Sequence, residues 1–200
     1  KSYNSTNSKF NFPFKKKWQI DTDQNIDDKN PYLPDPLYFA SYIYLINTNG
    51  YLYKINSEDG KLVWKKQIFN DLEDTIVGTP AIAGIKNKNN TVTLYAHNGS
   101  RELFAINGVD GTVIWKKKNE LPFRGGITSY KNFLFVSDFD GNFLSFNKRN
   151  GKLVWNVFLG SEYNSVYTTA RPLVVKNKVI VPGTGGTFFV IAINTGEVLW

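Results

Sequence analysis

A tryptophan placed four residues after a glycine recurs four times in this 200-residue chain. The pairs are Gly60 and Trp64, Gly111 and Trp115, Gly151 and Trp155, and Gly196 and Trp200. With 16 glycines and five tryptophans in the chain, about 0.4 such pairs would arise by chance. The chain is therefore built from a repeated unit, which restricts the fold to repeat architectures.

The spacing of the repeat indicates what each unit is. The four tryptophans are 51, 40 and 45 residues apart, which is the length of a four-stranded propeller blade. Dipeptides such as Asn49-Gly50 and Asp59-Gly60 favour tight hairpins, and short β-branched or aromatic runs such as 91–96 and 133–137 lie between such turns. No helical periodicity is present. We predict an all-β fold, a β-propeller of four-stranded blades.

Each glycine and tryptophan has a physical role in such a blade. The glycine can adopt a positive φ, and a large indole suits the space between neighbouring sheets. We expect Trp64, Trp115 and Trp155 to be largely buried between blades on outer strands, and Trp200 to be less buried because no blade follows it. Residues 1–200 form one partial propeller domain in this interpretation. It has an N-terminal segment at 1–20 and blades that end near 64, 115, 155 and 200.

Composition excludes several classes of site. The chain has no cysteine, so it has no disulfide, thiol catalysis or thiolate metal site, and the single His97 makes a histidine-based metal site a poor interpretation. No window approaches the roughly 18 apolar residues of a membrane-spanning helix, and the first thirty residues lack the apolar core of a secretory leader. Both ends have the appearance of cuts within a larger ring.

The net charge of +7 does not predict nucleic-acid binding. Twenty of the 24 basic residues are lysine and four are arginine, and the chain has 23 asparagines. Proteins that recognise specific bases depend on arginine for bidentate contacts. The lysine runs at 65–66 and 116–118 directly follow tryptophans, at repeat edges. Lysine at a strand edge discourages pairing with other sheets, so we expect no nucleic-acid partner.

The pattern Leu-x-Ala-Ile-Asn-x-x-x-Gly-x-x-x-Trp at 103–115 resembles the tryptophan-docking repeat of the propellers related to pyrroloquinoline-quinone (PQQ) enzymes. The resemblance covers about 160 residues and implies a ring of eight blades, of which this chain supplies about four. In that family a short N-terminal segment completes the ring, and the stretch 12–18 is similar to it.

Within the family, the chain is most similar to the outer-membrane assembly lipoproteins of the BamB type, which are non-enzymatic scaffolds. Their Leu-x-Leu-Arg-Gly loop contacts a barrel-assembly protein, and Leu121, Phe123 and Arg124 match it position by position. Tyr167, in the next loop, stands where the family has one of two acidic residues. The resemblance implies a protein partner at these four residues, a periplasmic location, a lipid anchor upstream and no cofactor. An alternative is that Leu121 and Phe123 only seal the core between blades.

Two other classes remain open. PQQ-dependent alcohol or sugar dehydrogenases share the repeat and bind the quinone with calcium, but they carry a cysteine pair before an Arg-Gly. Here Arg124-Gly125 follows no cysteine, and Thr187 replaces the calcium-binding glutamate of a glycine-rich loop. That loop precedes a predicted strand, which is atypical of a phosphate site. The third class is the propeller ectodomain of a membrane sensor, for which Asn4, Asn89 and Asn98 would be glycosylation acceptors.

Overall fold

A computed structural model describes residues 15–22, 35–47, 49–69, 80–160, 170–183 and 187–200. All of the regular structure in these ranges is β-strand, in fifteen strands. Within the same ranges, no helix is long and apolar enough to cross a membrane.

The strands form four antiparallel sheets, each made from strands that are consecutive in the chain. The first blade holds β1 (Leu37–Phe39), β2 (Tyr42–Ile46), β3 (Tyr51–Asn56) and β4 (Leu62–Gln67). The second holds β5 (Ala81–Lys86), β6 (Val92–His97), β7 (Glu102–Asn107) and β8 (Val113–Lys118). The third holds β9 (Phe123–Tyr130), β10 (Phe133–Asp138), β11 (Asn142–Asn147) and β12 (Leu153–Phe158). The fourth holds β13 (Leu173–Val175), β14 (Lys178–Pro182) and β15 (Phe188–Ala192), and an isolated bridge between Ile191 and Val198 starts a further pairing.

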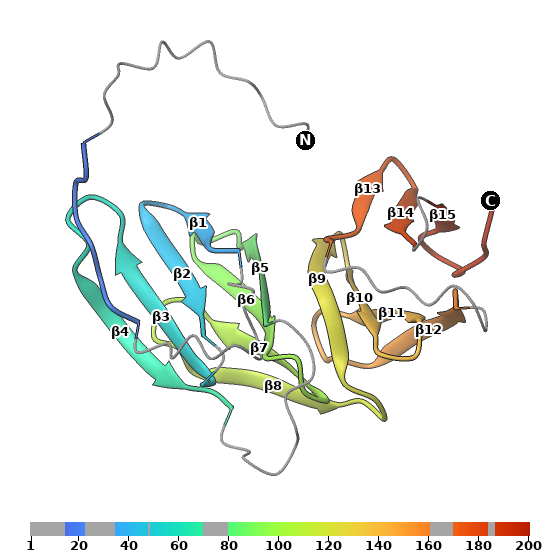
Figure 1. The fold of residues 1–200 in the computed structure, drawn as a ribbon, viewed down its shortest axis with the longest axis horizontal. Helices are drawn as coiled ribbons and strands as arrows, with labels where there is room; N and C mark the ends of the chain where they lie inside the picture. The colour runs from blue at the N-terminus through green and yellow to red at the C-terminus, as the bar shows by residue number, and fades with distance from the viewer. Residues whose placement is uncertain (1–14, 23–34, 48, 70–79, 161–169, 184–186) are drawn as a thin grey trace.

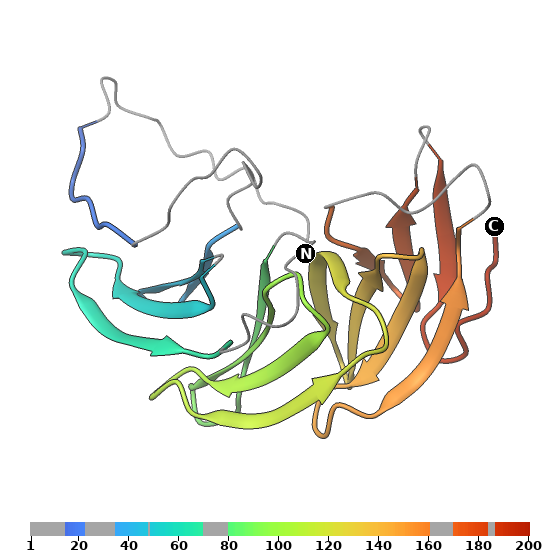
Figure 2. The same ribbon diagram turned by 60° about the horizontal axis from the view of Figure 1, so that its bottom comes forward.

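The four sheets stand side by side in an arc (Figures 1 and 2). The first strands of the blades are neighbours across the inside of the arc, because β5 contacts both β1 and β9, and β9 contacts β13. The last strands, β4, β8 and β12, are sheet edges and lie on the outside. This arrangement confirms the predicted all-β propeller fold.

Strand burial follows from position in the arc. The third strands β7 and β11 are buried on both faces, which is why each reads as a nearly continuous apolar run. The outer strands β4 and β8 are exposed except at one residue each, Trp64 and Trp115. The indole is therefore the main contribution of an outer strand to the space between blades.

Four of the five indoles pack on a glycine of the next blade and donate a hydrogen bond to a backbone carbonyl near that glycine. The four Nε1–H···O=C pairs are Trp18 to Ser57, Trp64 to Val109, Trp115 to Lys148 and Trp155 to Ile193, at 3.0, 2.9, 3.0 and 2.8 Å. The receiving glycines all have positive φ, between 66° and 78°: Gly60, Gly111, Gly151 and Gly196. A side chain at any of them would strike the indole or the lysine beside it.

The prediction that Trp64, Trp115 and Trp155 are more buried than Trp200 is confirmed, but only Trp155 is largely buried. Trp155 is 9% exposed, whereas Trp64 and Trp115 are half-buried on outer strands. Trp200 is 65% exposed and packs edge-on against Phe188, with 5.0 Å between ring centroids. The low burial of Trp200 agrees with the absence of a following blade in this chain.

Trp18 adds a docking contact that the repeat pattern did not predict. Its segment lies along the first blade, where the Thr22 carbonyl accepts hydrogen bonds from the Asn47 side chain at 2.9 Å and the Tyr53 hydroxyl at 2.6 Å. The segment thus occupies the position that the outer strand of a preceding blade would take.

The glycines belong to turns that the sequence specifies locally. In the second blade the Asn107 side chain accepts the Val109 N–H at 3.0 Å, and the Asp110 side chain accepts the Thr112 N–H at 3.0 Å. These two side-chain turns bring Gly111 round so that its N–H bonds the Asn107 carbonyl at 2.8 Å. The Ile-Asn-x-x-Asp-Gly pattern of the repeat therefore encodes the turn that positions the glycine.

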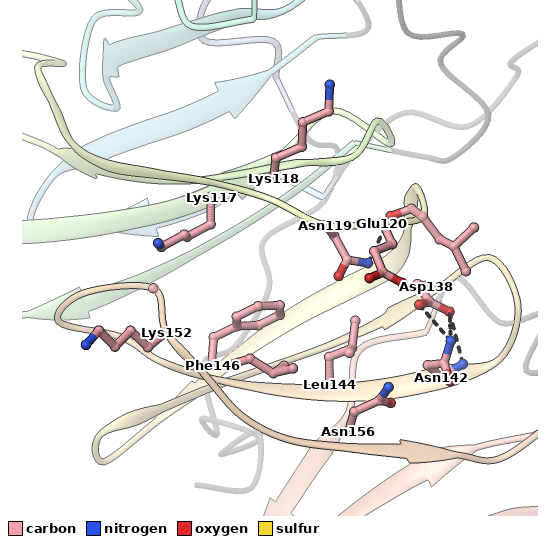
Figure 3. A pocket seen from close by; sticks show the side chains of 13 residues that line it. Lys117, Lys118, Asn119, Glu120, Asp138, Asn142, Leu144, Phe146, Lys152 and Asn156 are labelled. Atoms are coloured by element: carbon pink, nitrogen blue, oxygen red, sulfur yellow. Dashed lines mark hydrogen bonds between the residues drawn. The ribbon is translucent and has the colours of Figure 1, made fainter.

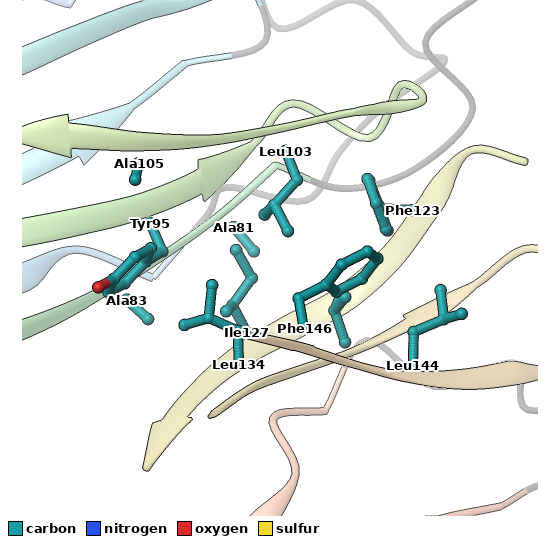
Figure 4. Close-up of a cluster of buried hydrophobic side chains, with 11 residues drawn as sticks. Ala81, Ala83, Tyr95, Leu103, Ala105, Phe123, Ile127, Leu134, Leu144 and Phe146 are labelled. Atoms are coloured by element: carbon teal, nitrogen blue, oxygen red, sulfur yellow. The ribbon is translucent and has the colours of Figure 1, made fainter. Parts of the chain in front are cut away.

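The core is divided among the spaces between adjacent blades. Figure 4 shows the cluster between the second and third blades, where side chains of β5 and β7 meet those of β9, β10 and β11. Its members are Ala81, Ala83, Tyr95, Leu103, Ala105, Phe123, Ile127, Leu134, Val136, Leu144 and Phe146.

Candidate partner-binding site

The loop at 119–122 joins β8 to β9 and is held by backbone hydrogen bonds at both ends. The Asn119 N–H bonds the Arg101 carbonyl at 2.8 Å, and the Phe123 N–H bonds the Ser100 carbonyl at 2.9 Å. The Asn119 side-chain amide donates to the Leu121 carbonyl at 2.9 Å, which closes the loop on itself. The loop is therefore pinned to the hairpin turn of the second blade rather than free in solvent.

The four residues predicted to contact a partner occupy different environments. Leu121 and Arg124 are partly exposed, whereas Phe123 is fully buried in the cluster of Figure 4. Because the Phe123 ring packs against Phe146 at 6.0 Å between centroids, we give it a packing role. Tyr167 lies outside the described residues.

Arg124 is oriented by an aromatic ring on the neighbouring turn. Its guanidinium carbon lies 4.6 Å from the centroid of Phe139, a distance typical of a cation–π contact. The Phe139 N–H in turn bonds the Pro122 carbonyl at 3.0 Å. The loop, Arg124 and the β10–β11 turn therefore form one connected surface.

The two glycines after Arg124 have structural reasons to be glycine. Gly125 has a φ of +78°, and the register between β9 and β10 shifts beside it. A Cβ on Gly126 would lie 2.8 Å from the Cα of Arg171, so the backbone leading into β13 passes directly over it. The side chain of Arg171 then reaches the Ile82 carbonyl on β5 at 3.1 Å, across the inside of the arc.

His97 is a second tie between the blades that sequence reasoning missed. Its Nδ1 accepts the Gly99 N–H at 3.1 Å, which leaves the proton on Nε2 to donate to the Gly125 carbonyl at 3.0 Å. The ring is fully buried, and loss of solvation lowers the pKa of His97 to about 4, although the bond to Gly125 opposes the shift. His97 is thus a neutral structural residue that fixes the strand on which Arg124 lies.

Beside the loop is an open groove of about 470 Å³, between β8 and the face of the third blade. Figure 3 shows Lys117 and Lys152 at one end, Leu144 and Phe146 in the middle, and Asp138 at the other end. Asp138 is buried and accepts hydrogen bonds from the Asn142 side chain, at 2.9 Å to Oδ2. Burial raises the pKa of Asp138, and the bonds from Asn142 oppose this shift.

The comparison with protein families decides the affiliation of the chain. The family model described as "Outer membrane protein assembly factor BamB" matches residues 88–200, which is more than half of the chain. The chain belongs to this family.

Individual relatives include BamB proteins and a quinoprotein dehydrogenase. The BamB of Shewanella oneidensis is 23% identical over 79% of this chain and 36% of its own length. The quinoprotein alcohol dehydrogenase PedH of Pseudomonas putida is 27% identical over 54% of this chain and 20% of its own length. The chain therefore spans a fifth to about a third of these two relatives.

A solved structure places the fold in the same group. The crystal structure of BamB from Moraxella catarrhalis superposes with a TM-score of 0.60 at 18% identity, over 82% of this chain and half of that one. At this identity the likeness supports the propeller fold of the BamB-family chain and nothing finer.

Two positions of this BamB-family chain differ from the sequence pattern of the dehydrogenase branch. Calcium sites gather several charged or carbonyl oxygens, and Thr187 offers one neutral hydroxyl where the glutamate would be. No thiol precedes Arg124. In the described part of the chain, no three His, Cys, Asp or Glu side chains cluster in a way that could hold a metal ion.

Proposed function

We propose that this chain is part of a non-enzymatic propeller scaffold that binds a protein of the outer-membrane β-barrel assembly machinery. The supporting observation is the surface formed by Leu121 and Arg124, which a pinned loop presents beside the Phe139 ring. A partly exposed aliphatic residue next to an oriented arginine has the composition of a binding hot spot. Rigid backbone support lowers the entropy cost of binding.

The same proposal places the protein in the periplasm, tethered to the outer membrane by a lipid anchor upstream. Trp18 supports a larger ring, because it docks on Gly60 as the tryptophan of a preceding blade would. Further blades would then supply the strands that lie beside the 15–22 segment.

The test is a titration of the full-length protein with the purified periplasmic region of the barrel-assembly protein from the same organism. We expect saturable binding that Leu121→Ala with Arg124→Ala weakens by about 2–4 kcal/mol, the range for truncating hot-spot residues. Arg149→Ala is the matched control, because Arg149 is exposed on the opposite end of the same blade. Unchanged binding by the folded double variant would contradict the assignment of this loop.

A PQQ-dependent dehydrogenase is the second candidate, and the similarity to PedH is the observation that favours it. Its test is to add PQQ and calcium to the full-length protein, then measure bound quinone and dye-linked alcohol oxidation. The scaffold proposal expects neither. Stoichiometric quinone uptake with alcohol turnover would replace it.

A further inference from the structure

The residues that directly follow the outer strands β4, β8 and β12 differ in polarity among the three spaces between the described blades. Equivalent positions are identified by the same backbone bond to the preceding hairpin turn. Ile68 donates to the Gly50 carbonyl at 2.9 Å, Asn119 to the Arg101 carbonyl at 2.8 Å and Leu159 to the Gly141 carbonyl at 2.9 Å. The three residues thus occupy one structural position in successive blades.

At the first and third of these spaces the chain supplies its own apolar plug. Ile68 packs against the cluster between the first and second blades, and the next residue, Phe69, is buried edge-on against Phe104 at 4.6 Å between centroids. Leu159 is buried between the third and fourth blades with Ile191. In both cases the apolar plug shares a buried cluster with a third-strand residue of the next blade, Phe104 in β7 or Ile191 in β15.

At the middle space the corresponding residues are polar. Asn119 turns its amide toward the Leu121 carbonyl, and Glu120, which aligns with Phe69, is exposed. Leu144 aligns with Phe104 and lines the groove of Figure 3. The groove lies at the junction that lacks these apolar residues, with the buried Leu144 and Phe146 in its lining, and its volume lies within the range of about 300–1,000 Å³ common for binding clefts.

The charges around the groove indicate the chemistry of an occupant. Lys117 and Lys152 are exposed at the end away from Asp138, and neither forms an ion pair within the described part of the chain. Glu120 and Asp138 place two acidic side chains toward the other end, and Lys118 also lines the groove. A ligand with an apolar centre and a carboxylate at the lysine end would match both features.

We propose that this groove receives an extended segment of the protein partner, which inserts a bulky aliphatic or aromatic side chain over Leu144 and places an acidic residue against Lys117 and Lys152. The inserted side chain corresponds to Phe69 at the first junction, whereas at the third junction the apolar side chain, Leu159, stands one position earlier, at the position of Asn119. The inference rests on the proposed function, since it names how the same partner is held. It also explains why the groove adjoins Leu121.

The decisive variant fills the groove from within. Asn119→Ile with Glu120→Phe copies the plug of the first junction, so we expect a raised unfolding midpoint and at least about a tenfold loss of affinity for the barrel-assembly region. Asn194→Leu with Glu197→Phe adds matched apolar groups at exposed positions of the fourth blade and is expected to leave binding unchanged. Wild-type affinity in a folded plugged variant would overturn the inference while the scaffold function stands.

A second variant covers the case in which the plugged chain does not fold. Lys152→Glu reverses one charge at the lysine end and is expected to weaken binding at least about fivefold, more at low salt, whereas the exposed Lys88→Glu is not. Equal affinity of the two charge variants would also overturn the inference. Sedimentation gives a further test. If the wild-type protein is a dimer and the Asn119→Ile, Glu120→Phe variant is a monomer, the groove binds a second copy of the chain and the inference is overturned. If wild-type protein binds no barrel-assembly region, the proposed function itself fails.

Discussion

Trp155 and Gly196 are packed so closely that a Cβ on the glycine would lie 2.9–3.1 Å from three atoms of the indole ring. The glycine also has a φ of +76°, which other residues adopt at a cost of roughly 1–2 kcal/mol. Gly196→Ala should therefore destabilise the protein by at least that amount in urea unfolding. Gly160→Ala is the control, since its φ lies outside the left-handed region and its Cβ would meet the movable ring of the exposed Phe158 at 2.9 Å and the Asp140 carbonyl oxygen at 3.2 Å, so we expect a smaller loss.

The burial of the indoles predicts an order of stability losses. Trp155→Ala removes a buried ring and its hydrogen bond to Ile193, so we expect a loss of about 3–5 kcal/mol. Trp200→Ala should change stability by less than about 1 kcal/mol because most of that ring is in solvent. Denaturant midpoints of the two variants give the comparison, and equal losses would contradict the docking account.

Trp18 should hold its segment to the first blade. Trp18→Ala removes the indole packed on Gly60 and the bond to Ser57, while the Thr22 contacts remain. We expect faster tryptic cleavage after Lys15, Lys16 or Lys17 under native conditions. The exposed Gln19→Ala serves as the control, and cleavage at the wild-type rate in the Trp18 variant would show that docking does not anchor the segment.

The buried His97 predicts a loss of stability in mild acid. Burial lowers the pKa of His97 from its ordinary value of 6.5 to about 4 in the folded state, so between these values the unfolded chain binds the proton more readily. The contribution of neutral His97 to the free energy of unfolding is fully present above pH 6.5. It falls as the pH drops toward 4, by about 3 kcal/mol over the whole window.

His97→Gln isolates this effect, because glutamine keeps a donor and an acceptor but does not titrate. The raised pKa of Asp138 works in the opposite direction in acid, so the informative quantity is the difference between wild type and variant. Urea unfolding at several values between pH 4 and 7 should show a steeper decline for wild type. Parallel curves would mean that His97 is not buried in its neutral form.

The repeat predicted the propeller, but not which residues touch. The glycine and tryptophan of one Gly-x-x-x-Trp unit do not contact each other: Gly111 receives Trp64, while Trp115 docks on Gly151. The spacing reflects a turn at the start of an outer strand and an indole on that strand. Trp18 was missed as a docking residue because the pattern requires a glycine four residues earlier, where the chain has Phe14. The glycine that receives Trp18 is Gly60 of the first blade.

The candidate site was less accessible to sequence reasoning because it depends on contacts between distant segments. The loop composition predicted a binding surface at Leu121, Phe123 and Arg124, yet only the packing between blades shows that Phe123 faces inward. The role of His97 depends on the Gly125 carbonyl, 28 residues away. Polar residues at 119 and 120 become informative only when their structural equivalents, Ile68 and Phe69, are known.

The most direct test of the scaffold account is calorimetric titration of the full-length protein with the barrel-assembly periplasmic region, run in parallel with an assay of PQQ-dependent alcohol oxidation. The account predicts saturable binding that the Leu121→Ala, Arg124→Ala variant weakens by about 2–4 kcal/mol, with no quinone-dependent turnover. Absence of binding, together with stoichiometric quinone uptake and turnover, would contradict it.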